Sequence, residues 1–306
     1  MIRERLDALA RVEAEIAAAG AKQSPALQAR RDELLAALAD LTPRDKVRLA
    51  RHPRRPRIGA YIDALFTDFF EQRGDRLGHE DPSILGGIAL LHGRPVTVIG
   101  HRKGKNIEES IACNFGMPGP EGYRKALRMM HQAEKFGRPV ITFIDTPGAY
   151  PGMEAEARGQ GEAIARNLAE MSRLTVPVIA VVTGEASSGG ALALGVANRV
   201  LMLENAIYAV LSPEGFASIL WKDASRKDEA AGMMRLTAQD LLSFGVIEEI
   251  VPEPVGGAQR EPEAVFAALD AALMRHLGEM DGLTGEELAR QRAQKFRKIG
   301  QAEGSR

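Results

Sequence analysis

The chain has 306 residues, of which 45% are hydrophobic and 26% charged, so it is long enough for one large α/β domain with appended elements. Its 40 basic and 41 acidic residues nearly cancel, which leaves no global field to attract nucleic acid or an anionic membrane. The single cysteine, Cys113, excludes an intrachain disulfide framework and a cysteine-based zinc ribbon within this chain. The first residues include acidic groups and no apolar leader, and no run nears the ~18 apolar residues of a membrane helix, so we expect a soluble, cytoplasmic protein.

The N-terminal residues 1–42 predict a helical hairpin. Apolar residues recur every three or four positions from Ile2 to Ile16 and again from Leu27 to Leu41. Between them, residues 20–25 supply a glycine stop, a capping serine and a proline at the first helical position. Two helices cannot bury both apolar stripes alone, so we expect the hairpin to dock on the main domain or on a partner subunit.

A basic segment, residues 44–57, follows a capping start at Thr42 to Asp45. It contains Arg44, Lys46, Arg48, Arg51, Arg54, Arg55 and Arg57. One interpretation is a solvated helix followed by a proline-punctuated loop, and the other is a contact with an anion or a subunit. The aromatic interleaving typical of single-strand binders is missing.

From residue 84 onward, strands and helices alternate. A β-hairpin is predicted at 84–91 and 95–99, and later patterns predict helices near 122–136, 154–173 and 189–197 and strands at 140–145, 176–182 and 199–203. This alternation argues for βαβ units with right-handed crossovers. Further helical patterns cover 226–235 and 237–243, a last short strand covers 245–252, and a charged helical segment from about 262 onward is expected to fray at its end.

Two glycine-rich turns, residues 145–152 and 183–190, each follow a buried apolar strand and feed a helix. Because the carboxyl ends of parallel strands meet at one crevice, their amides can point at a common ligand. We therefore expect the main-chain N–H groups of Gly148 and Ala149, with those of Gly189 and Gly190, to hold a developing oxyanion. The alternative is that the first turn is an ordinary strand-to-helix loop, which also favours proline and glycine.

Two other interpretations of the second turn are excluded. A dehydrogenase nucleotide loop would place three residues between the glycines rather than the four between Gly184 and Gly189, and no tyrosine has a lysine four positions on. A serine hydrolase using Ser187 or Ser188 would need the G-x-S-x-G pattern, which is not met. It would also need a nearby base, and no histidine occurs between His131 and His276.

Charged candidates are weaker. Glu185 is a possible general base, although a carboxylate beside a glycine turn more often caps or pairs with a neighbour. Lys103, Lys105 and Arg102 follow a predicted strand and are candidates for phosphate contact, against the simpler interpretation that they are solubilising. Metal ligands at recognisable spacing are absent from the sequence, so no metal site is expected.

Several motifs resemble one known family in order along the chain. They are residues 100–104, 114–128, 143–152, 158–168, 212–215 with 218–222, and 252–257. Over about 40–280 the sequence resembles the carboxyltransferase alpha subunits of bacterial acetyl-CoA carboxylases. The resemblance implies an α/β crotonase-type (ClpP/crotonase) fold of ββα superhelical units. It divides the chain into a hairpin at 1–42, a carboxyltransferase domain at 43–280 and a charged helical tail at 281–306.

The same resemblance implies an activity and partners. The family transfers a carboxyl group from carboxybiotin, on the biotin carboxyl carrier protein, to acetyl-CoA, which gives malonyl-CoA in the first committed step of fatty-acid synthesis. It implies an α2β2 assembly with a beta subunit that carries the zinc ribbon, and cooperation with an ATP-dependent biotin carboxylase. The active site would lie between the subunits, with biotin on the alpha side and most of the acyl-CoA on the beta side.

The chemistry agrees with a site made of main-chain amides. Both half-reactions place negative charge on an oxygen, and the ureido group of biotin can itself take the methyl proton of acetyl-CoA, so no protein base is required. We assign catalysis to Gly148, Ala149, Gly189 and Gly190. Candidate cofactor-binding residues are Tyr150, Gly184, Ser188, Lys103 and Lys105. Ala186 and Ser187 stand where relatives usually carry further glycines, and a non-catalytic scaffolding subunit remains the alternative function.

Overall fold

The computed structural model describes residues 2–19 and 24–301, and its centre is a mixed eight-stranded sheet. The strands are β1 (Thr67–Glu71), β2 (Ile84–Leu91), β3 (Arg94–His101), β4 (Val140–Thr146), β5 (Val178–Ser187), β6 (Arg199–Leu203), β7 (Ile207–Ala209) and β8 (Glu249–Val251). Their order is β1-β2-β3-β4-β5-β6-β8, and β7 pairs with the end of β5. β1, β2 and β3 are antiparallel neighbours, whereas the pairs from β3 to β8 are parallel.

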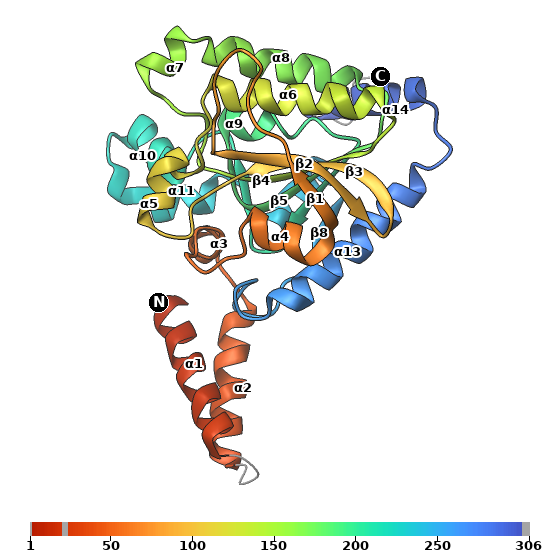
Figure 1. Cartoon of the computed structure of the whole chain (residues 1–306). Helices are drawn as coiled ribbons and strands as arrows, with labels where there is room; N and C mark the ends of the chain where they lie inside the picture. The colour runs from red at the N-terminus through yellow and green to blue at the C-terminus, as the bar shows by residue number, and fades with distance from the viewer. Residues whose placement is uncertain (1, 20–23, 302–306) are drawn as a thin grey trace.

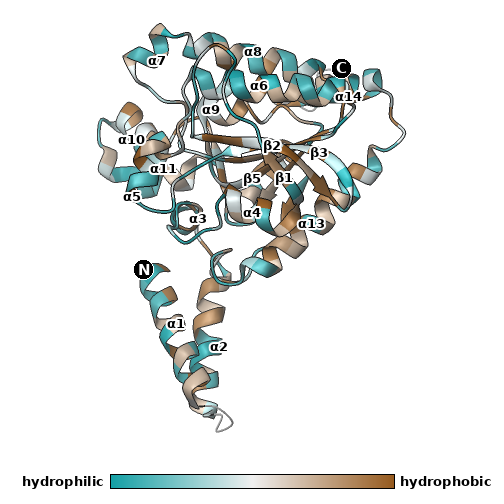
Figure 2. Ribbon diagram, in the orientation of Figure 1, coloured by the Kyte–Doolittle hydropathy of each residue, from teal (hydrophilic) through white to brown (hydrophobic). Residues whose placement is uncertain are grey.

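The central strands are apolar because both faces of the sheet are covered. Every residue of β4 and β5 is buried, which is typical of parallel strands between two helical layers. Figure 2 shows the brown, hydrophobic strands inside and teal residues on the outer helices. The predicted hairpin and the strands at 140–145 and 199–203 are confirmed within two residues. β5 runs to Ser187, so much of the predicted second turn is strand.

Helices form two layers around the sheet. The helices of the central region are α4 (Ile58–Leu65), α5 (Ile107–Ala112), α6 (Pro120–Lys135), α7 (Met153–Ala157), α8 (Gln160–Arg173), α9 (Ser188–Leu192), α10 (Pro213–Trp221), α11 (Lys227–Met233) and α12 (Ala238–Ser243). α6 packs over β2 and β3 and against α8, and α4 packs against α13 (Pro262–Glu279) on the opposite side (Figure 1).

Two predicted helices differ from the observed ones. The continuous helix expected at 154–173 is broken into α7 and α8 at Gly159, whose φ of +86° favours glycine and ends the first helix. The helix expected at 189–197 stops at Leu192. The strands β1 and β7 were not predicted, because β1 alternates weakly between exposed and half-buried residues and β7 has only three.

The predicted hairpin consists of α1 (Ile2–Ala19) and α2 (Pro25–Ala39), and it projects from one end of the body (Figure 1). Its apolar stripes form a cluster of Ile2, Leu9, Leu34 and Leu38 with Leu49 of α3 (Pro43–Ala50). An ion pair at 2.6 Å from Arg260 Nη2 to Glu13 Oε1 fixes it further, so docking on the main domain is confirmed. Most of the predicted connecting turn, residues 20–23, lies outside the described residues.

The C-terminal helix is part of the body. In α14 (Gly285–Lys298), Arg292 is fully buried and donates to the carbonyl oxygens of Met171 and Leu174 at 2.8 and 2.9 Å. Leu288 joins the main core. The expected fraying of 290–298 is therefore wrong, because buried contacts hold this charged helix; residues 302–306 lie outside the described part. Among the described helices, none is long and apolar enough to cross a membrane.

Candidate active site

The two glycine-rich turns lie against each other at the carboxyl edge of the sheet. β4 and β5 are parallel neighbours, with Thr146 opposite Ala186, so the segments that follow them emerge side by side. A Cβ atom added to Gly190 would lie 2.6 Å from Ala149 N and 2.6 Å from the carbonyl carbon of Gly148. Only glycine at position 190 permits this backbone-to-backbone approach.

Three of the four predicted amides remain available. The Gly148 N–H donates to Thr146 Oγ1 at 3.0 Å, and the Thr146 hydroxyl donates back to Gly148 O at 2.8 Å, so the structure differs from the expectation for this amide. Ala149 N has no hydrogen-bond partner among the described residues. Gly189 and Gly190 lie in the first turn of α9, before the first intrahelical bond, and the Ser187 side chain does not cap them.

Backbone geometry at both turns is unusual. Gly148 has a φ of +143°, which other residues rarely adopt. Ser188 has a φ of +60°, an uncommon left-handed conformation for a residue with a side chain. Its exposed side chain lies over the first turn, because a Cβ on Gly148 would be 3.9 Å from Ser188 Cβ. Ser188 therefore faces the space outside the two turns.

A buried carboxylate supports the turns from below. Asp145, at the end of β4, accepts from Lys103 Nζ at 2.6 Å, from Arg57 Nη1 at 2.7 Å and from Glu185 N at 3.1 Å. Burial alone would raise the pKa of Asp145, but the charges of Lys103 and Arg57 outweigh it and lower the pKa to about 2. The Asp145 carboxylate packs directly against the main chain of Gly184. Any other residue at position 184 would bring a Cβ atom into collision with Asp145 Oδ1.

Glu185 is held in an ion pair rather than free to act as a base. Arg51 donates to Glu185 Oε1 from Nη2 at 2.6 Å and from Nε at 3.0 Å, and its Nη1 reaches Glu214 at 2.9 Å. Lys103 Nζ lies 3.9 Å from the other Glu185 oxygen. Of the two interpretations of Glu185, the pairing one agrees with this geometry.

The basic segment 44–57 begins with the predicted helix, α3, but three of its arginines are turned into the protein. Arg51 and Arg57 turn inward to the carboxylates of the site, as described above. Arg55 donates from Nη1 to Glu253 Oε2 at 3.0 Å, and both side chains are fully buried. These three arginines therefore supply internal counter-charges, whereas Arg54 of the same segment is exposed and its contact stays a prediction.

The remaining candidate residues occupy different environments. Lys103 is 14% exposed and committed to Asp145, so it is not presented to a phosphate, whereas Lys105 is exposed. Tyr150 lies on the rim of the first turn, its main-chain N–H donates to Pro118 O at 3.0 Å, and the neighbouring Glu154 carboxylate raises the pKa of its hydroxyl. Within the described residues, no group of three or more histidine, cysteine, aspartate or glutamate side chains is placed to hold a metal ion.

Two buried side chains beside the turns were missed from the sequence. His101, at the end of β3, lies near the main chain of Phe143 and Gly190, and neither ring nitrogen forms a well-aligned hydrogen bond. Burial lowers the pKa of His101 to about 4, so the ring is neutral near pH 7. The Tyr123 hydroxyl, on α6, is buried without a partner and lies 3.0 Å from the Cβ position of Gly190. Both lie in motifs that carry the family resemblance, His101 in residues 100–104 and Tyr123 in residues 114–128, and this was the signal that could have found them.

Comparison with known proteins identifies the family. A family model described as "Acetyl co-enzyme A carboxylase carboxyltransferase-like" matches residues 1–300. The chain belongs to this family. It is 59% identical over 263 residues to the acetyl-coenzyme A carboxylase carboxyl transferase subunit alpha of Geobacillus kaustophilus, covering 86% of this chain and 81% of that protein. The corresponding subunit of Staphylococcus epidermidis is 56% identical over 261 residues, with coverages of 85% and 83%.

Solved structures of low identity share the fold of this family member. A Pseudomonas malonate decarboxylase hetero-dimer matches with a TM-score of 0.60 and 20% identity, over 84% of this chain and 96% of the other. The 12S transcarboxylase core matches with a TM-score of 0.57 and 21% identity, over 77% of this chain and 44% of the other. The family, the crotonase-type α/β fold and the carboxyltransferase class expected from the sequence are therefore confirmed.

Proposed function

We propose that this carboxyltransferase alpha chain stabilises negative charge on the ureido oxygen of biotin with main-chain amides from its two glycine-rich turns. The observation that carries the proposal is the unbonded Ala149 amide packed against Gly190. The amides of Gly189 and Gly190 supply the opposite side, and the Gly148 amide, which is bound to Thr146, holds the shape of the first turn.

Amides fixed in this way act without reorganising. They are aimed before the reaction begins, at a buried edge of the sheet where charge–dipole attraction is stronger than in water. Loss of one such donor typically costs about 3 to 4 kcal/mol of transition-state stabilisation. A serine, histidine or carboxylate nucleophile is not needed for this role.

The ionisable groups beneath the turns have positioning roles. Asp145 joins Lys103, Arg57 and the Glu185 main chain, and therefore fixes the end of β4 against β5. Arg51 holds Glu185 in turn. The carboxylates of Asp145 and Glu185 are both held in ion pairs, which supports a reaction in which the biotin ureido group takes the proton from the methyl group of acetyl-CoA.

Carboxybiotin, carried on the biotin carboxyl carrier protein, supplies the transferable carboxyl group when it is bound. The residues that would surround its ring are those at the rim of the turns. These are Ser188, which is exposed, and Tyr150, which is half-buried, whereas Gly184 and Lys103 would act indirectly by placing Asp145. Lys105, which is exposed beside the site, would contact the carrier protein or an anionic substrate group.

An apolar surface beside the turns supports a partner subunit. Helices α5, α7 and α10 lie on one side of the molecule in Figure 1. These helices and the segments next to them carry exposed large side chains: Ile107, Ile111, Phe115, Met153, Val210, Ile219 and Leu220. Met153 is 87% exposed and directly follows the first turn. Soluble single chains rarely leave such a patch uncovered. We assign it to the beta subunit of an α2β2 carboxyltransferase, with the zinc ribbon on that subunit, biotin carboxylase acting upstream, and a cytoplasmic location.

Reconstitution tests this function against the scaffolding alternative. Purified alpha chain is mixed with the beta subunit, and malonyl-CoA formation from acetyl-CoA and carboxybiotin is measured, with each subunit alone as a control. The proposal expects a stable complex that is active and single subunits that are inactive. Full activity of the beta subunit alone would make this chain a scaffold.

A further inference from the structure

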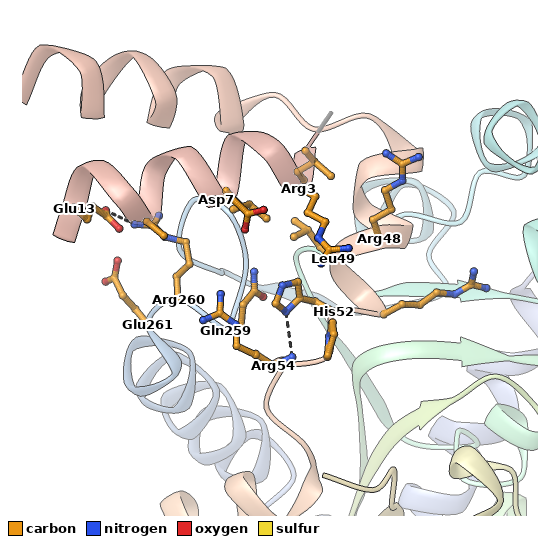
Figure 3. A pocket seen from close by; sticks show the side chains of 15 residues that line it. Arg3, Asp7, Glu13, Arg48, Leu49, His52, Arg54, Gln259, Arg260 and Glu261 are labelled. Carbon is orange, nitrogen blue, oxygen red and sulfur yellow. Dashed lines mark hydrogen bonds and ion pairs between the residues drawn. The ribbon is translucent and has the colours of Figure 1, made fainter. Parts of the chain in front are cut away.

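A cavity of about 900 Å³ lies away from the turns, at the junction of the hairpin and the body (Figure 3). One wall is α1, the second is the segment 51–54 after α3, and the third is the loop before α13. The volume is within the range of pockets that hold small organic ligands.

The cavity contains arginine side chains that have no ion-pair partner among the described residues. Figure 3 shows Arg3 and His52 near one another, with the main-chain nitrogen of Arg54 bonded to the His52 ring and the Arg54 side chain extending along the cavity toward Gln259. Neither the Arg3 guanidinium nor the Arg54 guanidinium has a hydrogen-bond or ion-pair partner among the described residues. Burial lowers the pKa of His52, and the charges of Arg54, Arg55, Arg3 and Arg57 lower it further, so a positive field converges on the ring.

The hydrogen bonding of His52 orients it as a donor. His52 Nδ1 accepts the Arg54 main-chain N–H at 3.2 Å. A neutral ring that accepts at Nδ1 carries its hydrogen on Nε2, which is then free to donate. Two guanidinium groups and one imidazole N–H form the donor set that phosphate oxygens prefer.

The rest of the lining suits the remainder of a larger ligand. Leu6 and Pro53 give apolar surface for a flat ring. At the opposite end Glu13 is neutralised by Arg260 at 2.6 Å, which leaves Glu261 as an acceptor for amino or hydroxyl groups, and Asp7 lies between the two ends, one turn of α1 from Arg3. Phosphate donors, apolar walls and acceptors together match a nucleotide.

We propose that this cavity binds a nucleotide, with its phosphate groups between Arg3, His52 and Arg54. The nucleotide is either free or the nucleotide portion of coenzyme A, since both present the same phosphate chemistry. Arg51 lines the cavity and also holds Glu185, so the site adjoins the strand that carries the second turn.

Calorimetric titration of the full chain with ADP tests the proposal. ADP should bind, added salt should weaken it, pyrophosphate should compete, and adenosine without phosphates should bind at least about tenfold more weakly. The double variant R3Q/R54Q removes two exposed, unpartnered side chains and should keep its melting temperature while losing at least about tenfold in ADP affinity.

A matched control removes the same charge elsewhere. R166Q/R173Q on the exposed face of α8 should bind ADP like the wild type. Equal ADP binding by R3Q/R54Q and the wild type, or no binding by the wild type, would overturn the proposal. Competition by coenzyme A would identify the substrate nucleotide as the ligand, and its failure to compete would identify a free nucleotide; either result supports the site. Because binding is measured without turnover, the outcome does not depend on the proposed function.

Discussion

Asp145 Oδ1 accepts a hydrogen bond at 3.1 Å from the main-chain nitrogen of Glu185, which ties the end of β4 to β5 at the point where both glycine-rich turns begin. Lys103 and Arg57 neutralise this carboxylate in the interior. The positions of the catalytic amides therefore depend on a buried charge that contacts no substrate.

Asp145→Asn should destabilise the protein strongly. The amide keeps the shape of the side chain but leaves Lys103 and Arg57 buried without a counter-charge, which costs about 3 to 5 kcal/mol. Urea unfolding at neutral pH measures the loss. The control is Asp63→Asn on the exposed face of α4, which should change the unfolding free energy by less than about 0.5 kcal/mol.

The same variant should alter the acid limb of stability. The pKa of Asp145 is lowered from its usual 3.8 to about 2, so its stabilising charge is fully present above pH 4 and is lost as the pH falls toward 2. Wild-type unfolding free energy should therefore fall in this window more steeply than that of D145N. Parallel curves for the two proteins would contradict the assignment.

His101 should make stability fall in mild acid. Its pKa is lowered from 6.5 to about 4, so the unfolded chain binds a proton first and stability is lost as the pH drops from 6.5 to 4, by up to about 3 kcal/mol. His101→Gln cannot be protonated and should lack this component. The measurement is the difference between wild-type and H101Q unfolding free energies across that range; a difference independent of pH would show that His101 is not buried as a neutral ring.

Tyr123→Phe tests the unpartnered hydroxyl beside Gly190. Removing a buried group that makes no hydrogen bond should leave the unfolding free energy unchanged or raise it by up to about 1 kcal/mol. Thermal and urea unfolding of Y123F and the wild type measure the difference in unfolding free energy. A loss above about 1 kcal/mol would mean that the hydroxyl has a hydrogen-bond partner in solution.

Deletion of residues 2–41 tests the boundary between the hairpin and the carboxyltransferase domain, which stays a prediction. The hairpin has its own apolar cluster, separate from the main core, and its deletion breaks the Arg260–Glu13 pair and uncovers Leu49. The remaining chain carries Leu49→Gln so that the newly exposed position is polar. It should unfold cooperatively with a small loss of stability. Failure to fold would place the hairpin within the main folding unit.

The sequence predicted the meeting of the two turns because that prediction needed only local information. Continuous apolar runs before residues 145 and 183 predict parallel strands, and neighbouring parallel strands bring their ends together. The free amide of Ala149 follows from the same argument. The bound amide of Gly148 does not, because it depends on the rotamer of Thr146.

Local sequence patterns could not predict which arginines of the basic segment turn into the protein, nor that His101 is buried. Arg51, Arg55 and Arg57 are adjacent in a basic run, yet their partners lie 88 to 198 positions away in the chain. A run of charged residues does not by itself show which side chains are buried, because burial depends on whether the fold brings a carboxylate from elsewhere in the chain next to each one. His101 was likewise overlooked because its burial comes from packing against Gly190 rather than from its own strand pattern.

The most direct measurement compares Gly190→Ala with Gly189→Ala in the complex with the beta subunit. A Cβ at 190 meets main-chain atoms of the first turn at 2.6 Å, whereas a Cβ at 189 meets only Ile164 Cγ2 at an ordinary 3.4 Å. If amides from both turns stabilise the oxyanion, G190A should lose about 100-fold or more in malonyl-CoA formation while the complex still assembles, and G189A should remain within a few-fold of the wild type. Wild-type turnover by an assembled G190A complex would contradict the account.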